Sequence, residues 1–258
     1  MLSKNEVKYF SSLKLKKYRE KENKFLIEGV HLIEECLSST YPMDCVIKRD
    51  DLDMKEFDKL NILIRNKNIP VQSLKPSLFE KLTETKNSQG IIGIVKKQYC
   101  SNISELASAN LVIALDRIND PGNLGTIIRT AYWFGVDGIL ISDGSVDIYN
   151  SKVIRATQGA IFHIKVYQMI DLVNSLRTFH VSGYMVYLLT PHAEKSISEV
   201  IKGEKVIFVF GSESEGLSEE LMNENYEKIK IPGYTKCESL NISVSSAVVL
   251  YHFKGLVV

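Results

Sequence analysis

Five short apolar runs in the second half of the chain constrain the fold more than any other feature. Each is four or five residues long, rich in β-branched or aromatic residues, and separated from the next by a helical stretch. Such runs are typical of strands buried on both faces of a sheet. The pattern therefore predicts an α/β fold in which helices cover a parallel sheet with strands at 111–115, 138–141, 164–167, 185–189 and 206–210.

Two glycine-containing loops follow predicted strands near the C-terminus. The run 206–210 leads into a loop bounded by Gly211 and Gly216, and a short strand at 228–231 leads through Pro232-Gly233 to the last helix. Ligands of α/β proteins bind at the carboxyl ends of strands. The loops match neither a phosphate-binding P-loop nor a dinucleotide fingerprint. They indicate a small-ligand site of unspecified chemistry, and ordinary turns are an equal alternative.

Three ordered motifs make the interpretation specific. Residues 116–131, 211–217 and 231–241 resemble the three motifs of the SpoU (TrmH) class of SPOUT RNA methyltransferases, and the resemblance extends from about residue 111 to the C-terminus. It implies S-adenosyl-L-methionine as the cofactor and a C-terminal trefoil knot around it. It also implies a homodimer formed through the knotted domain.

The first part of the chain forms a smaller predicted α/β unit. Strands are expected at 24–29, 45–47 and 91–95, and helices at 30–37, 57–64 and 76–82. Its two ends resemble those of the substrate-binding domain that precedes many SpoU catalytic domains and is similar to an RNA-gripping ribosomal-protein fold. We expect an RNA-binding domain at 1–98, a linker at 99–109 and the catalytic domain at 110–258.

The composition mainly excludes certain classes of protein and site. The formal net charge of +1 requires any RNA-binding surface to be local. The four cysteines show no Cys-x-x-Cys pair and the five histidines are scattered, so reduced thiols and no metal site are expected. There is no signal-peptide core and no apolar run approaching the roughly 18 residues of a membrane span. We therefore expect a cytoplasmic protein.

Basic residues are concentrated near the N-terminus. Residues 1–30 contain eight Lys or Arg against four Glu. Such a segment can contact a phosphate backbone, although a solvated helical face is the plainer alternative. A second basic stretch follows the first motif and resembles the corresponding family segment. The candidate RNA-binding residues from both stretches are Lys14, Lys16, Lys17, Arg19, Lys152 and Arg155.

The first motif carries two candidate catalytic residues, Asn123 and Arg129. Asn123 stands before a predicted helix, where an N-cap is the simple alternative. Gly125 costs about 1 kcal/mol relative to Ala in a helix interior and leaves a slot beside Arg129, one helical turn later. A phosphate or ribose in that slot would meet the guanidinium, and a structural salt bridge is the alternative. The resemblance places both in the catalytic centre; since guanidinium stays protonated, positioning the acceptor nucleotide suits Arg129.

The other two motifs supply the remaining candidates. By resemblance, Glu213, Ser239 and Asn241 join the catalytic set. The structural alternatives are a charge before the start of a helix expected at 217–226 for Glu213, and capping of the last helix for Ser239 and Asn241. Asn241 could serve both purposes. Strand-end loops provide main-chain groups and apolar walls suited to adenine. The resemblance implies that the cofactor-binding residues are Gly211, Gly216, Ile231, Pro232 and Leu240.

Together these features predict a methyltransferase that acts on a ribose 2′-hydroxyl of structured RNA. Ribosomal RNA, with 23S rRNA first, is favoured over tRNA because the separate N-terminal domain resembles those of rRNA-modifying members of the family. Two other classes stay open: a non-catalytic RNA-binding or ribosome-assembly factor, and an unrelated nucleotide-binding α/β enzyme. The intact motif side chains argue against the first alternative, and the missing phosphate-loop lysine argues against the second.

Overall fold

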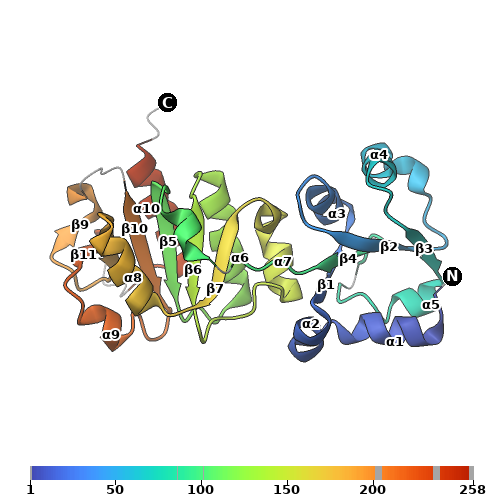
Figure 1. The fold of residues 1–258 in the computed structure, drawn as a ribbon, viewed down its shortest axis with the longest axis horizontal. Coiled ribbons are helices and arrows are strands. Elements are labelled where there is room, and N and C mark those ends of the chain that lie inside the picture. Colours follow the sequence, from blue (N-terminus) through green and yellow to red (C-terminus); the bar gives the residue numbers. More distant parts are fainter. Residues whose placement is uncertain (1, 86, 101, 201–204, 235–238, 256–258) are drawn as a thin grey trace. The chain divides into compact units, whose positions relative to one another are not determined.

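The computed structural model describes residues 2–85, 87–100, 102–200, 205–234 and 239–255. By internal contacts the chain forms two compact units (Figure 1). Unit 1 comprises Met1–Gln98 and Asp147–His163, and unit 2 comprises Tyr99–Val146 and Ile164–Val258. Residues 147–163 thus group with the N-terminal part of the chain. The functional boundaries expected at 98 and 110 remain predictions.

Unit 1 is built on a four-stranded sheet with strand order β1-β4-β2-β3. β4 runs antiparallel to both β1 and β2, and β3 runs parallel to β2. Helices α1 and α2 precede the sheet, and α7 joins the unit from later in the chain. The bounds are α1 Lys4–Ser12, α2 Lys16–Glu22, β1 Lys24–Glu28, α3 Val30–Leu37, β2 Met43–Arg49, α4 Asp58–Asn66, β3 Val71–Leu74, α5 Pro76–Phe79, β4 Ile91–Lys96 and α7 Ser151–Thr157.

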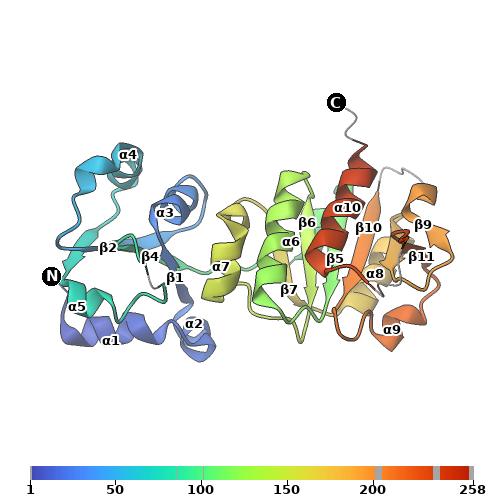
Figure 2. The same cartoon turned by 180° about the vertical axis from the view of Figure 1, so that it is seen from behind.

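Unit 2 is built on a seven-stranded, wholly parallel sheet with strand order β7-β6-β5-β10-β8-β11-β9. Helices α6 and α10 lie on one face and α8 on the other, as the opposite views show (Figures 1 and 2). The bounds are β5 Leu111–Asp116, α6 Pro121–Trp133, β6 Gly138–Ser142, β7 Lys165–Ile170, α8 Leu172–Val181, β8 Met185–Leu189, β9 Lys195–Ser196, β10 Val206–Gly211, α9 Glu219–Met222, β11 Glu227–Lys230 and α10 Ile242–Lys254.

The two central strands confirm the reasoning from apolar runs. Every residue of β5 is buried, and so is every residue of β10 except its terminal Gly211. With both faces covered, these strands have no solvent side that would require alternating polar residues. The five predicted strands of this sheet are confirmed as β5, β6, β7, β8 and β10.

One local expectation, a helix over 217–226, was wrong. That stretch forms only one helical turn, α9, and β11 follows at Glu227. The expected linker contains a short 3₁₀ turn, Ile103–Leu106, whose Leu106 is buried in the core of unit 2 beside Ala109. The trefoil knot remains a prediction.

Candidate functional site

Strand pairing brings the first two motifs together. β5 and β10 are hydrogen-bonded neighbours in parallel register, and Asp116 at the end of β5 lies opposite Gly211 at the end of β10. Strands placed after β5 extend the sheet in both directions, so this pair lies where the strand order reverses. That is the position at which open α/β sheets bind ligands.

The loop after β10 closes on itself through its backbone. The amide of Ser212 donates to the carbonyl of Gly216 at 3.0 Å, and the amide of Gly216 donates to the carbonyl of Ser212 at 2.8 Å. Gly216 has φ +67°, which favours glycine. A β-carbon at Gly211 would lie 2.3 Å from the carbonyl carbon of Gly216. Both glycines are therefore required by this closed loop.

Replacing Gly211 by alanine should open the loop. The added methyl group meets backbone, which cannot swing aside, so we expect a loss of about 1–3 kcal/mol in unfolding free energy together with loss of ligand binding. Gly233→Ala is the matched control, because no described atom lies within 4 Å of its β-carbon position. Denaturant unfolding of both variants checks this, and equal stability of the two variants would contradict it.

Asn123 connects all three motifs. Its side-chain amide donates to the carboxylate of Glu213, and its Oδ1 accepts from Nδ2 of Asn241 at 3.0 Å. The interpretation of Asn123 as an N-cap was wrong: α6 begins two residues earlier, and Asp120 caps it by accepting from the Asn123 backbone amide at 2.8 Å. The Asn123 side chain is thereby left available for these contacts.

Asn241 caps the last helix and also contacts the first motif. Its Oδ1 caps α10 by accepting from the backbone amides of Ser243 at 2.9 Å and Val244 at 3.4 Å. Its Nδ2 remains to donate to Asn123. The orientation of Asn123 is therefore coupled to the start of the last helix. A displacement of α10 would move Asn123 and so change its contact with Glu213.

The carboxyl group of Glu213 has a pKa above its ordinary value of 4.5. Desolvation is the main cause, the negative charge of Asp120 adds to it, and the hydrogen bond from Asn123 opposes both. A raised carboxyl pKa means that folding disfavours the ionised form. At neutral pH, the ionised carboxylate of Glu213 therefore lowers the stability of the folded protein.

Glu213→Gln removes that cost while keeping an oxygen that can accept from Asn123. We therefore expect the variant to be at least as stable as the unaltered protein at pH 7. The stability advantage of the variant should disappear as the pH falls through the raised pKa of Glu213. The carboxyl group of the unaltered protein then becomes neutral in both the folded and the unfolded state. Thermal unfolding between pH 4 and 7 checks this; an advantage that grows on acidification would contradict it.

A second set of contacts, not anticipated from the sequence, ties the same two motifs. The carboxylate of Asp116, which is 4% exposed, accepts from the backbone amide of Ser218 at 2.8 Å. Nη1 of Arg117 donates to Glu215 at 2.7 Å. All of these residues stand within or next to the motifs, yet nothing in the local pattern pairs residues about 100 positions apart.

Arg129 is exposed on α6, and no hydrogen bond or ion pair involves it within the described parts of the chain. The structural salt bridge considered as its alternative role is thus not seen among these residues. The structure does not bring Arg129 into contact with Asn123, Glu213 or Asn241. Its guanidinium faces solvent, as a group that contacts a substrate must.

Among the residues expected to hold a cofactor, Gly211 ends β10, Ile231 and Pro232 follow β11, and Leu240 directly precedes the N-cap of α10. Ile231 is half-buried, whereas Pro232, Ser239 and Leu240 are exposed. No described atom lies within 4 Å of the β-carbon position of Gly216. These features leave main-chain groups and apolar side chains open to a ligand. The third motif's residues 235–238, including Cys237, lie outside the described residues.

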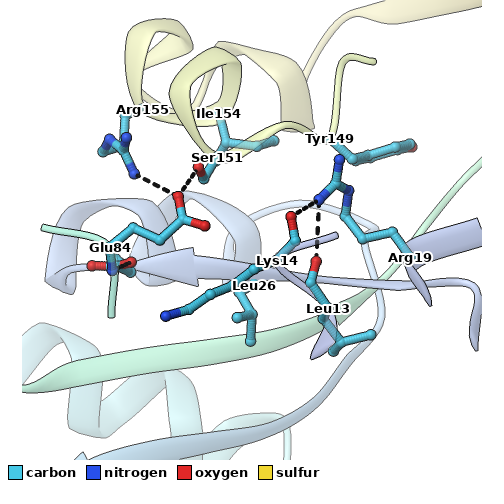
Figure 3. Close-up of a pocket in the computed structure, with 10 residues that line it drawn as sticks. Leu13, Lys14, Arg19, Leu26, Glu84, Tyr149, Ser151, Ile154 and Arg155 are labelled. Carbon is cyan, nitrogen blue, oxygen red and sulfur yellow. Dashed lines mark hydrogen bonds and ion pairs between the residues drawn. The ribbon is translucent and has the colours of Figure 1, made fainter. Parts of the chain in front are cut away.

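Arg19 was wrongly expected to contact RNA. It is 4% exposed; its Nη2 and Nε donate to Asp147 at 2.7 and 3.1 Å, and its Nη1 donates to the carbonyls of Leu13 and Lys14 at 3.2 and 2.6 Å. Figure 3 shows the guanidinium turned toward these two carbonyls. With all three nitrogens occupied inside unit 1, Arg19 is a structural residue.

The other basic candidates differ in accessibility. Lys14 donates to the carbonyls of Lys81 and Thr83 at 2.7 and 2.9 Å, and Arg155 lies 3.9 Å from Glu84, which also accepts from Ser151 (Figure 3). Lys16 makes a 3.8 Å ion pair with Glu20 on an exposed face. Lys17 and Lys152 are exposed. The exposed lysines are better placed for RNA than Lys14.

Comparison with known proteins identifies the family. The sequence model described as the SpoU rRNA Methylase family matches residues 110–251. The chain belongs to the SpoU rRNA methylase family. A model described as the MRM3-like substrate binding domain matches residues 4–93 of this SpoU protein. The resemblance stated from the motifs is thereby confirmed.

Relatives of this SpoU protein match almost its whole length. It is 32% identical to the 23S rRNA (guanosine(2553)-2′-O)-methyltransferase RlmP of Bacillus subtilis over 97% of this chain and 96% of that protein. A putative TrmH-family RNA methyltransferase structure from Porphyromonas gingivalis is 28% identical, with a TM-score of 0.84 and 98% of each chain covered. The AdoMet-bound rRNA methyltransferase from Sinorhizobium meliloti shares the fold, with a TM-score of 0.86, 24% identity, and coverage of 100% and 97% of the two chains.

Two kinds of feature are absent from the described ranges. No group of three or more His, Cys, Asp or Glu side chains is arranged to hold a metal ion. No helix in those ranges has the length and apolar character needed to cross a membrane.

Proposed function

We propose that this protein transfers a methyl group from S-adenosyl-L-methionine to a ribose 2′-hydroxyl of structured RNA, with 23S rRNA as the favoured substrate. The observation that carries the proposal is the hydrogen-bonded chain Glu213–Asn123–Asn241, in which one side chain from each motif meets at the strand-order reversal. The near full-length similarity to the RlmP methyltransferase supports the reaction and the rRNA substrate.

The residues at the ends of β10 and β11 suit the proposed cofactor. Gly211 and Gly216 keep the loop backbone accessible, while Ile231, Pro232 and Leu240 offer apolar contact to an adenosine. S-adenosyl-L-methionine supplies an electrophilic methyl group. The protein then has mainly to align the ribose oxygen with that methyl group, a task of positioning more than of acid–base chemistry.

Four side chains share that positioning. Glu213 holds the amide of Asn123 in one orientation, and Asn241 holds its oxygen. Arg129 is the charged group available to bind a phosphate of the acceptor nucleotide, where its permanent charge orients the ribose. Ser239 remains a candidate for orienting the third motif. The 2′-hydroxyl proton passes to substrate phosphate or solvent in this scheme, because Arg129 stays protonated.

RNA binding is assigned to unit 1, which carries the exposed basic residues Lys16, Lys17 and Lys152. The match to a substrate-binding domain supports this assignment. The segment 211–227 of unit 2 contains six Glu and no Lys or Arg. Because phosphates are repelled by such a segment, the substrate strand approaches the catalytic residues from another side.

A homodimer formed through α6 and α10, in the cytoplasm, completes the proposal. These neighbouring helices carry large exposed aromatic side chains: Trp133 is 82% exposed, Tyr251 58% and Tyr132 48%. Apolar side chains gathered on adjoining helices mark protein contacts. Sedimentation of the purified protein tests this point, and a mass of one chain at micromolar concentration contradicts it.

The decisive experiment maps ribose methylation across rRNA and tRNA in cells with the gene, without it, and with Arg129→Ala. One 2′-O-methyl mark should vanish in the deletion and fall about 10- to 100-fold in the variant, the effect of losing a charge-assisted hydrogen bond to phosphate. Arg177→Ala, which removes another exposed helical arginine of unit 2, is the control. Unchanged marks alongside intact RNA binding would favour a non-catalytic binding factor.

A further inference from the structure

Arg117 has a backbone conformation that few side chains adopt. Its φ is +55°, in the left-handed region that favours glycine. The residue stands directly after β5, at the strand end where the site is built. Backbone strain retained at such a position is a reason to look for a function of the side chain.

The side chain of Arg117 lies between two carboxylates of different exposure. Nη1 donates to Glu215, whose side chain is 64% exposed, at 2.7 Å. Nε is 3.5 Å from the buried Asp116 and has no hydrogen-bond partner among the described atoms. The backbone amide of Arg117 donates to the hydroxyl of Ser142 at 2.8 Å. Both ends of the residue are thus fixed, and its cation points at the loop after β10.

Among the described residues, three side chains of unit 2 hydrogen-bond to that loop or to Ser218 directly after it. Asn123 contacts Glu213, Arg117 contacts Glu215, and Asp116 accepts from the amide of Ser218. The Arg117 contact is the one that combines an ion pair with a strained backbone. A glycine at this position would adopt φ +55° without strain but would leave Glu215 unattached.

We propose that Arg117 is a positioning residue that holds the loop 211–217 in its cofactor-binding shape through Glu215. The inference rests on the proposed function, since it concerns affinity for S-adenosyl-L-methionine. Arg117 does not contact the reacting atoms in this scheme. The contact between Arg117 and Glu215 restricts the loop before the cofactor binds, so the loop loses less conformational entropy on binding. Removal of Arg117 therefore weakens cofactor binding and leaves RNA binding unchanged.

The test compares three variants by calorimetric titration with S-adenosyl-L-methionine. Arg117→Gly and Glu215→Ala should each raise the Kd about fivefold, the scale of one partly exposed ion pair, and the double variant should bind no more weakly than either alone. The KM for RNA should not change. Glu220→Ala removes an exposed carboxylate from the same acidic segment and controls for the altered field around a cationic ligand.

The outcomes separate the inference from the proposed function. If the unaltered protein does not bind S-adenosyl-L-methionine, both are overturned. If it binds and the variants bind equally well, only the role of Arg117 is overturned. Loss of thermal stability in Arg117→Gly with an unchanged Kd for Glu215→Ala would also overturn it, because that pattern belongs to a structural residue.

Discussion

Asn123→Ala is expected to lower the rate of methyl transfer about 100- to 1,000-fold while the protein stays folded. The substitution removes both the donor to Glu213 and the acceptor for Asn241, so the three motifs lose their shared contact. Losses of this size follow when a positioning group is removed from a reaction that depends on alignment. Single-turnover assays with saturating cofactor measure the chemical step directly.

Asn174→Ala is a closely matched control. Asn174 is the third residue of α8, and the Asp171 N-cap accepts from its backbone amide, just as Asp120 does for Asn123 in α6. The two substitutions therefore perturb equivalent helix starts in the same unit. If both variants lose activity to the same extent, helix stability and not the Glu213–Asn123–Asn241 chain is responsible.

Arg19→Ala is expected to destabilise unit 1 by about 3 kcal/mol. The variant leaves the carboxylate of Asp147, with a side chain 8% exposed, without its cation, and an unpaired buried charge is costly. For a unit of this size the loss corresponds to a fall of about 10 °C in Tm. Hydrogen exchange of the β1 amides, compared with those of β5, would assign the loss to unit 1.

Lys16→Ala provides the comparison. Lys16 lies in the same helix, but its ion pair with Glu20 is long and exposed, so its loss should change stability by less than about 0.5 kcal/mol. Equal unfolding free energies for Arg19→Ala and Lys16→Ala would contradict the structural role of Arg19. That result would also make Arg19 a candidate for RNA contact again.

The sequence predicted the framework of unit 2 well because that framework depends on local signals. Apolar runs gave the buried strands, and glycines marked the closed loop after β10. The helix expected at 217–226 is only the single turn α9, and β11 begins at Glu227, beyond the expected helix. Helical spacing alone therefore overestimated the length of α9, because propensity is a weak guide that tertiary context overrides.

The partners of the site side chains could not be predicted in the same way. Asn123 meets residues 90 and 118 positions away, and Arg19 meets one 128 positions away. The local sequence around a charged residue near the N-terminus is the same whether its side chain lies in solvent or pairs with a buried carboxylate. Only the resemblance to the SpoU motifs placed Asn123, Glu213 and Asn241 in one site before the fold was known.

The grouping of Asp147–His163 with unit 1 limits how the chain can be divided into fragments. The polypeptide passes from one unit to the other at 98/99, at 146/147 and again at 163/164. A fragment that ends at Gln98 keeps Arg19 and loses Asp147, the carboxylate with which it pairs. Asp147 lies within the residues matched by the SpoU rRNA Methylase family model, so neither matched segment alone contains the whole of unit 1.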